Sequence, residues 1–285
     1  MKNKVVSIVC VVLIIAAIIC FGYIFINSKS KDKPADDVKQ EETIDKDSTD
    51  VIEREERGKN INVNSRIGIQ LKELIKYSDI YSNDIINELD NGGLTSKAKL
   101  LIGLDRIYRK SEYQSYLEYS EEYNNSYILP TNMNAVLSCV FQDPTVSSKE
   151  VDGILNYDTA TNVYVVVSRG FQTGSIGYTL EVPYKITEYS DRVELDAYRV
   201  YVTKTIEMNE TQSITKTEMF YDKAKSRSAL TIDENNSDYT EEKQLDYIKD
   251  KVDTGVLNEN SLEKVKYTFI SNEGEYRIQS FEKIK

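Results

Sequence analysis

The longest uninterrupted hydrophobic stretch lies at the start of the chain. Residues 5–26 carry no charge and consist mainly of Val, Ile, Leu and Ala. As a helix rising about 1.5 Å per residue, this stretch extends roughly 33 Å, which is enough to cross a hydrocarbon core of about 30 Å. The pattern therefore predicts a transmembrane helix.

A cleaved signal peptide and a lipoprotein signal are the two competing interpretations of this stretch. A cleavage site needs small residues, but Phe21 and Phe25 continue the apolar run past Cys20. A lipid-modified cysteine normally follows a small residue, whereas Ile19 precedes Cys20. We therefore expect residues 1–27 to form a cytoplasmic tail and a retained anchor.

The direction of the anchor depends on the length of its flanks, because the charges nearly cancel. Lys2 and Lys4 on one side are balanced by Lys29, Lys31 and Lys33 on the other, so the positive-inside rule is close to a tie. A four-residue tail is usually left inside while a long C-terminal domain is exported. We expect the domain that follows to be extracytoplasmic.

Residues 28–60 are dominated by charges of both signs and contain almost no apolar positions. Such a segment cannot bury enough surface to offset the entropy lost on ordering. We expect a disordered charged linker with an end-to-end distance of roughly 30 Å, followed by a soluble domain over residues 61–285.

Apolar residues recur three and four positions apart over residues 66–141, which is the period of amphipathic helices. A glycine pair at residues 92–93 ends one helix, and Thr95 or Ser96 can cap the next. A further short helix fits residues 132–141. The apolar positions of the first helices are Leu71, Leu74, Ile75, Ile85, Ile86, Leu89, Leu100, Leu101, Leu104 and Ile107.

Tyr113, Tyr116, Tyr119 and Tyr123 continue the helical spacing. Such a strip can grip a sugar or a peptide, or it can pack a helix against a sheet; we favour packing. Cys139 lies in the last apolar run. With no histidine anywhere in the chain to activate it, we expect a small buried hydrophobe and no nucleophile.

The period changes to two over residues 160–285, which predicts strands. The clearest strand spans residues 178–187, and Pro183 on its polar side removes a hydrogen-bond donor, which predicts an edge position or a bulge. Its apolar positions are Tyr178, Leu180, Val182, Tyr184 and Ile186, and its polar positions are Thr179, Glu181, Lys185 and Thr187. Further strands fit residues 163–167, 192–203, 213–221, 265–270 and 275–284, and a surface helix fits residues 240–252.

Short connections between these strands make the sheet mostly antiparallel. The predicted fold class is therefore α+β, with an N-terminal transmembrane helix followed by helices packed on a curved, mostly antiparallel sheet.

Charge and composition narrow the function. The net charge is −11, but the first 33 residues carry +4, which leaves −15 on residues 34–285. A surface of this sign repels nucleic acid and anionic lipid, so we expect no nucleic-acid partner. The absence of histidine removes the commonest general base and zinc ligand, and no cysteine cluster replaces it, so we expect no metal, no cofactor and no enzyme activity.

Three groups of residues are candidates for catalysis or ligand binding. The glycine-rich run at residues 170–177 lacks the ending of a phosphate loop and fits a hairpin connection. Glu194 and Asp196 share one strand face beside Tyr198, as paired carboxylates of a glycosidase or cation site can, but their alternation with apolar residues is typical of a half-exposed strand.

The third group begins like a calcium loop. Asp233, Asn235, Ser237 and Asp238 have the spacing, but the central glycine is absent and Gln244 occupies the twelfth place. We therefore assign no catalytic or metal-binding residues, and the ligand-binding residues stay unknown.

A helical half followed by a curved antiparallel sheet, behind one membrane helix and a spacer, loosely resembles the cone-shaped domains related to nuclear transport factor 2. The resemblance covers element order over about residues 95–285 and assigns no site residues. Membrane-anchored versions in bacterial conjugation and secretion machinery are assembly scaffolds, so the resemblance implies a scaffold and no catalyst.

Two functions compete on this basis. The first is a non-enzymatic binding or scaffold protein of the bacterial cell envelope, tethered to the cell membrane and holding a protein partner. The second is a small-ligand or cell-wall-glycan binding domain with a tyrosine-lined pocket, or, less favoured, a hydrolase that uses Glu194 and Asp196.

Overall fold

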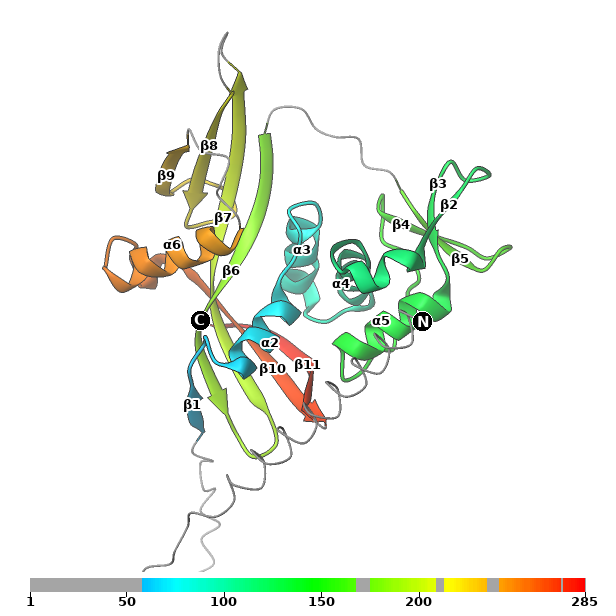
Figure 1. Ribbon diagram of the computed structural model, residues 1–285, viewed down its shortest axis with the longest axis horizontal. Helices are drawn as coiled ribbons and strands as arrows, with labels where there is room; N and C mark the ends of the chain where they lie inside the picture. The colour runs from blue at the N-terminus through cyan, green and yellow to red at the C-terminus, as the bar shows by residue number, and fades with distance from the viewer. Residues whose placement is uncertain (1–57, 168–174, 209–212, 235–240, 273, 285) are drawn as a thin grey trace, which may run out of the picture. The chain divides into compact units, whose positions relative to one another are not determined.

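The computed structural model describes residues 58–167, 175–208, 213–234, 241–272 and 274–284 (Figure 1). The predicted anchor and nearly all of the predicted linker lie outside these residues. Within them, no helix combines the length and the hydrophobicity needed to cross a membrane. The described part is α+β, with mostly antiparallel sheets and a few helices, as the sequence predicts.

The main sheet has the order β1-β6-β7-β10-β11, and every neighbouring pair is antiparallel. The long strand β7 pairs with β10 along its first half and with β8 along its second, and β8 pairs with β9. The strands are β1 (Lys59–Ile61), β6 (Ser175–Glu188), β7 (Val193–Met208), β8 (Ser213–Phe220), β9 (Ser228–Glu234), β10 (Glu263–Asn272) and β11 (Glu275–Ile284). Residues 59 and 60, which the composition assigned to the linker, belong to β1 and therefore to the sheet.

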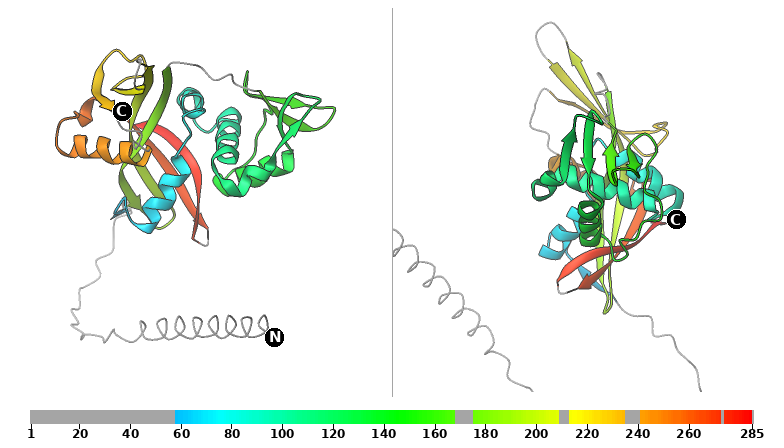
Figure 2. Two further views of the ribbon diagram at one scale, coloured as in Figure 1. Left: turned by 45° about the horizontal axis from the view of Figure 1, so that its top comes forward. Right: turned by 90° about the vertical axis from the view of Figure 1, so that its right-hand side faces the viewer.

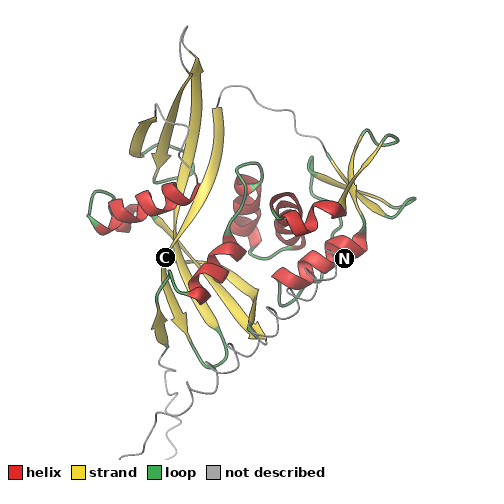
Figure 3. Ribbon diagram, viewed as in Figure 1, coloured by secondary structure: helices red, strands yellow, loops and turns green. Residues whose placement is uncertain are grey.

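Four helices form a layer on one face of this sheet: α2 (Arg66–Ile75), α3 (Ser82–Gly92), α4 (Ser96–Arg109) and α5 (Pro130–Val140). Helices α2, α3 and α5 contact its strands, and α4 packs between α3 and α5. The predicted helical spacing is confirmed, because the apolar positions of α2, α3 and α4 are buried in one core with the sheet. The predicted cap is confirmed as well, since the Thr95 hydroxyl accepts a hydrogen bond from the Ala98 N–H at 3.1 Å. Figure 3 shows these helices gathered between two sheets.

The opposite face of the main sheet carries a second, smaller core. Helix α6 (Glu241–Asp253), predicted at residues 240–252, packs Ile248 against Leu180 and Val200 of the sheet. The same core includes Leu257 and Leu262, on either side of the 3₁₀ turn η2 (Glu259–Ser261). Both faces of the middle of the sheet are therefore covered, although strand alternation is typical of a sheet with one wet face.

The predicted helical region over residues 66–141 is wrong in its middle. After the 3₁₀ helix η1 (Ser111–Tyr116), the chain forms β2 (Leu117–Ser120) and β3 (Asn125–Ile128). With β4 (Leu155–Asp158) and β5 (Val163–Val166) they make a separate antiparallel sheet of order β2-β3-β5-β4, which Figures 1 and 2 show beside α4 and α5.

The tyrosine strip is consequently divided between different elements. Tyr113 and Tyr116 lie in η1 and pack against the main core, whereas Tyr119 is 63% exposed on β2. Tyr123 donates a hydrogen bond to Asp158 of β4. Tyrosine favours strands more than helices, and Asn124 adopts a left-handed conformation that turns the chain between β2 and β3, so local chemistry overrides the helical spacing.

Two smaller predictions are also corrected. Cys139 is exposed, because the buried face of α5 is formed by Met133, Val136, Leu137 and Val140 and the thiol lies on the other side. The glycine-rich run at residues 170–177, most of which lies outside the described residues, is no hairpin connection, since β5 and β6 belong to different sheets.

The close approach of α2 to the segment before it gives a testable prediction. A Cβ added at Gly68 would lie 2.2 Å from the Val63 carbonyl oxygen, a backbone atom that cannot rotate away. We expect Gly68→Ala to lower the free energy of unfolding by about 2 kcal/mol, measured by chemical denaturation.

Gly103→Ala in α4 is the matched control. There a Cβ would meet only the tips of Leu137 and Met133, both at 2.9 Å, which are side-chain atoms that can shift. Alanine also gains about 1 kcal/mol of helix propensity over glycine, so we expect a change within about 1 kcal/mol. Equal losses for the two variants would contradict the backbone-contact explanation.

Candidate functional site

The paired carboxylates Glu194 and Asp196 do share one face of β7, as predicted, but cations of the same sheet hold them. Glu194 accepts from Arg192 at 3.0 Å and from Lys266 at 3.1 Å, and Lys185 lies 3.9 Å from Asp196. Neither carboxylate lines the pocket described below. Glu194 is thus paired within the sheet, whereas Asp196 is 9% exposed and its buried Oδ1 has no hydrogen-bond partner among the described residues.

The pKa values of the two groups nevertheless differ in direction. Burial raises the pKa of Asp196, whereas for Glu194 the burial effect is outweighed by Arg192 and Lys266, which lower its pKa. Divergent carboxyl pKa values are a pattern of acid–base catalysis. Here, however, both oxygens of Glu194 are occupied by cations, so the arrangement does not favour a hydrolase.

The structure assigns no metal site to the residues it describes. No group of three or more potential His, Cys, Asp or Glu ligands occurs among them. Most of the calcium-like run at residues 233–244 lies outside the described part, and Gln244 at its end is buried, accepting a hydrogen bond from Tyr178 at 2.8 Å. That glutamine joins α6 to the sheet.

The feature of this region that the sequence predicts best is the edge position of β6. Strand β1 pairs with β6 only at Ile186–Glu188, so between Ser175 and Lys185 this side of β6 has no neighbouring strand among the described residues. Pro183 lies on this open side, and the register shifts between Pro183 and Lys185. Both alternatives predicted for the proline, an edge position and a bulge, are confirmed.

Helix α3 covers the upper part of the open edge with side chains. The Ser82 hydroxyl accepts from the Thr179 N–H at 3.2 Å, and the Asn83 amide donates to the Gly177 carbonyl at 2.6 Å. These contacts show that the backbone groups of Gly177 and Thr179 point away from β7. Because this direction alternates along a strand, the N–H and C=O of Glu181 also face the open side.

Below these contacts, a pocket of about 360 Å³ straddles the edge of β6. Residues 179–183 form its floor, and the strand contributes residues from both of its faces. The C-terminal part of α2 and Tyr77 form one wall, with Ile69 and Ile75 as apolar contacts, and α6 forms the other wall through Leu245. Ile69 is 56% exposed at the rim.

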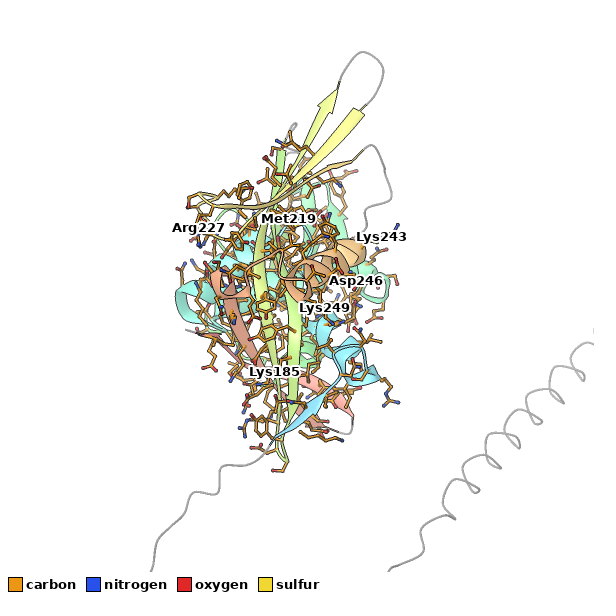
Figure 4. All side chains as sticks on the ribbon, turned by 90° about the vertical axis from the view of Figure 1, so that its left-hand side faces the viewer. Lys185, Met219, Arg227, Lys243, Asp246 and Lys249 are labelled. Atoms are coloured by element: carbon orange, nitrogen blue, oxygen red, sulfur yellow. The ribbon has the colours of Figure 1, made fainter. Side chains whose placement is uncertain are left out.

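Lysines surround this pocket on a chain that is otherwise strongly acidic. Lys72 and Lys76 approach from α2, and Lys249 approaches from α6. Burial lowers the pKa of Lys72, and the charge of Lys249 lowers it further, while Asp246 acts in the opposite sense. Figure 4 shows Asp246 and Lys249 on α6, with Lys185 farther along β6.

The acidic group on the α2 wall is already neutralised. Burial by itself would raise the pKa of Glu73, but a hydrogen bond and the charge of Lys110 hold it below its usual value. Arg109 contributes in the same direction.

The lining contains three lysines, Lys72, Lys76 and Lys249, and three carboxylates, Glu73, Glu181 and Asp246. Glu73 and Glu181 are paired with Lys110 and Arg199, and Lys72 Nζ donates to the neutral Asn64 Oδ1 at 2.8 Å, so Lys72 and Lys249 face a single remaining carboxylate, Asp246.

Beneath the pocket lies a buried ionic cluster. Arg199 of β7, which is 0% exposed, donates from Nε to Glu181 Oε1 at 2.8 Å. The Tyr267 hydroxyl donates to Glu181 Oε2 at 2.7 Å, and the hydroxyls of Tyr77 and Tyr267 lie 3.2 Å apart. Glu181 and Tyr77 also line the pocket, so its floor is fixed by this cluster.

The cluster extends to the helices and to β11. Arg199 Nη1 also donates to Asp90 of α3, and Lys283 Nζ lies 2.9 Å from the other Asp90 oxygen. Burial raises the pKa of Glu181, and although burial opposes the charge of Arg199, its carboxylate partners raise the arginine pKa above its ordinary value. We expect a charged arginine that holds two carboxylates from different elements.

Only part of this site was visible in the sequence. Alternation placed Glu181 on the polar side of its strand, and Pro183 signalled the edge. The lysines of α2 and α6 carry no signal by themselves, because helices separated by more than 150 residues meet there.

Comparisons of the chain with protein-family models, with curated proteins and with solved structures found no match. The assignment of function therefore depends on the geometry of the pocket and on the sequence pattern.

The ionic cluster generates a prediction about stability. Arg199→Met leaves the buried Glu181 without its cation and Asp90 with Lys283 alone, so we expect the free energy of unfolding at pH 8 to fall by about 3–5 kcal/mol. Arg192→Met, which removes a half-exposed surface pair, should cost less than about 1 kcal/mol.

The same variant should depend on pH in a defined direction. Without Arg199, burial and the charge of Asp90 raise the pKa of Glu181 against the Tyr267 hydrogen bond alone, so this pKa lies further above the unfolded value of 4.5. A raised carboxyl pKa favours the folded state at low pH, and this advantage is lost as pH rises through the folded pKa. The deficit of the variant relative to the wild type should be smaller at pH 4 than at pH 8, and equal deficits would contradict the cluster's role.

Proposed function

We propose that this chain is a membrane-tethered, non-enzymatic binding or scaffold protein of the bacterial cell envelope, which holds a protein partner at the pocket on β6. The observation that carries the proposal is the open edge of β6 with a pocket beside it. Proteins usually protect such edges by short strands, charges or covering elements, and among the described residues α3 covers only the upper part of this edge and β1 only its lower end.

The sequence supports the tether. An uncharged run of membrane-spanning length precedes a charged spacer, and a short N-terminal tail favours export of the C-terminal domain. A spacer with an end-to-end distance of roughly 30 Å would let the domain reach partners away from the bilayer. The scaffold role implied by the resemblance to domains related to nuclear transport factor 2 agrees with this proposal.

The alternative functions gain less support. A volume of about 360 Å³ is near the lower end of small-molecule sites, which range from about 300 to 1,000 Å³. Glycan sites use exposed aromatic rings, whereas the tyrosine in this pocket, Tyr77, is buried and bonded to Tyr267. Glu194 and Asp196 are held by cations outside the pocket.

A photo-crosslinking amino acid tests the proposed binding site in living cells. Placed at Ile69 on the pocket rim, it should yield a discrete adduct heavier than the monomer. Placed at Tyr119, which is comparably exposed but lies on β2 of the small sheet, it should not. Recovery of the monomer alone from both positions would contradict a protein-binding role for the pocket.

Protease accessibility tests the proposed orientation. A protease added to intact cells should remove the domain that follows residue 60, because the short tail favours its export. The fragments can be followed by an antibody against a C-terminal tag, with a cytoplasmic protein as the control. Digestion only after permeabilisation would show the opposite orientation.

A further inference from the structure

We propose that the pocket binds an acidic peptide segment in an extended conformation, which adds a short strand to the open edge of β6. This inference rests on the proposed function and specifies the chemistry of the partner at the same site.

The backbone of β6 supplies the first argument. At residues 181–183 its outward-facing groups comprise the N–H and C=O of Glu181 and the C=O of Pro183, by alternation from the contacts at Gly177 and Thr179. An extended peptide satisfies such groups by strand addition, in which main-chain hydrogen bonds give affinity and side-chain pockets give specificity. Pro183 accepts but cannot donate, so it does not block a partner that donates there.

The length of the available edge sets the size of the segment. Helix α3 occupies the edge down to Thr179, and β1 occupies it from Ile186. Five or six residues of β6 remain between these limits, which at about 3.4 Å per residue correspond to a segment of roughly 17–20 Å.

The walls of the pocket select a single strand over a second copy of this chain. Helices α2 and α6 flank the edge on opposite faces of the sheet. A whole sheet edge with its own covering helices would meet these walls, whereas one extended strand fits between them. Its alternate side chains would face Ile69 and Ile75 on one side and Leu245 on the other.

Charge supplies the last argument. Lys72 and Lys249 line the pocket from opposite walls. Burial is the main cause of the lowered pKa of Lys72, repulsion by Lys249 adds to it, and Asp246 acts in the opposite sense. A carboxylate placed between them relieves this repulsion and binds both. The net charge of −11 on the whole chain disfavours acidic partners elsewhere on the surface, so the lysines of the pocket offer an acidic segment a local site on a chain that otherwise repels it.

The experiment uses the full chain in detergent and a defined probe, a fluorescent heptapeptide that alternates glutamate with valine. A peptide of the same length that alternates lysine with valine is the charge control. By fluorescence anisotropy, we expect the acidic peptide to bind at least about tenfold more tightly than the basic one.

Two further comparisons test the pocket and the binding mode. Lys249→Glu should weaken the acidic peptide by about tenfold, whereas Lys243→Glu, the same change on α6 outside the pocket lining, should alter binding by less than about twofold. In a strand, alternate N–H groups point to opposite sides. Peptides N-methylated at all glutamates or at all valines should therefore differ, with one set abolishing binding and the other preserving it.

Each contrary result has a distinct meaning. Equal binding of the acidic and basic peptides would overturn the charge argument, and tolerance of both methylation patterns would overturn strand addition. A crosslink from Ile69 that joins two copies of this chain would replace the peptide by a self-interface. If the Ile69 position captures a partner but no peptide binds, the inference fails while the proposed function stands; if neither occurs, both fail.

Discussion

Arg199 is the constraint on which the rest of the described structure depends. A fully buried guanidinium is tolerated only when carboxylates compensate its charge, and here these are Asp90 of α3 and Glu181 of β6. Because Asp90 and Glu181 are separated by 90 residues, their common cation fixes the helical layer in register with the sheet. The same pairing holds Glu181 in position beneath the pocket. One buried charge therefore connects the helical layer over the first core with the strand that forms the floor of the candidate site.

The sequence predicted well those elements whose signal is local. The apolar spacing of α2, α3 and α4 and the cap at Thr95 depend on neighbours within a few residues, and both appear as expected. The alternation in β6 holds for Leu180 and Val182, but the bulge after Pro183 turns Ile186 to the opposite core, so the prediction of one apolar face is wrong there. Arg199 could not be recognised in this way. Its alternation with the apolar Val200 is typical of a residue on the solvent-facing side of a sheet with one covered face. Arg199 is buried because α3 packs over this side as well, which the local sequence does not show.

The candidate site was predictable to a similar extent and for the same reason. Pro183 predicts an edge position because its missing N–H can be read from the sequence alone. The proximity of Lys72 to Lys249 depends on tertiary structure and cannot be read in this way. The strands β2 and β3 were missed because tyrosines three and four positions apart satisfy a helical period, while their own strand preference and the turn at Asn124 decide the outcome.

The proline and the adjacent bulge in β6 have a consequence for the free protein. An exposed strand edge is a template on which chains can stack into fibrils, and growth of such a stack needs an uninterrupted ladder of donors and acceptors. In β6 the row of outward-facing donors and acceptors is interrupted at Pro183, which has no N–H. Ser82 and Asn83 occupy this row at Thr179 and Gly177, and β1 occupies it from Ile186 onward. The exposed part of this edge is therefore too short and too interrupted to seed stacking of one copy of the chain on another.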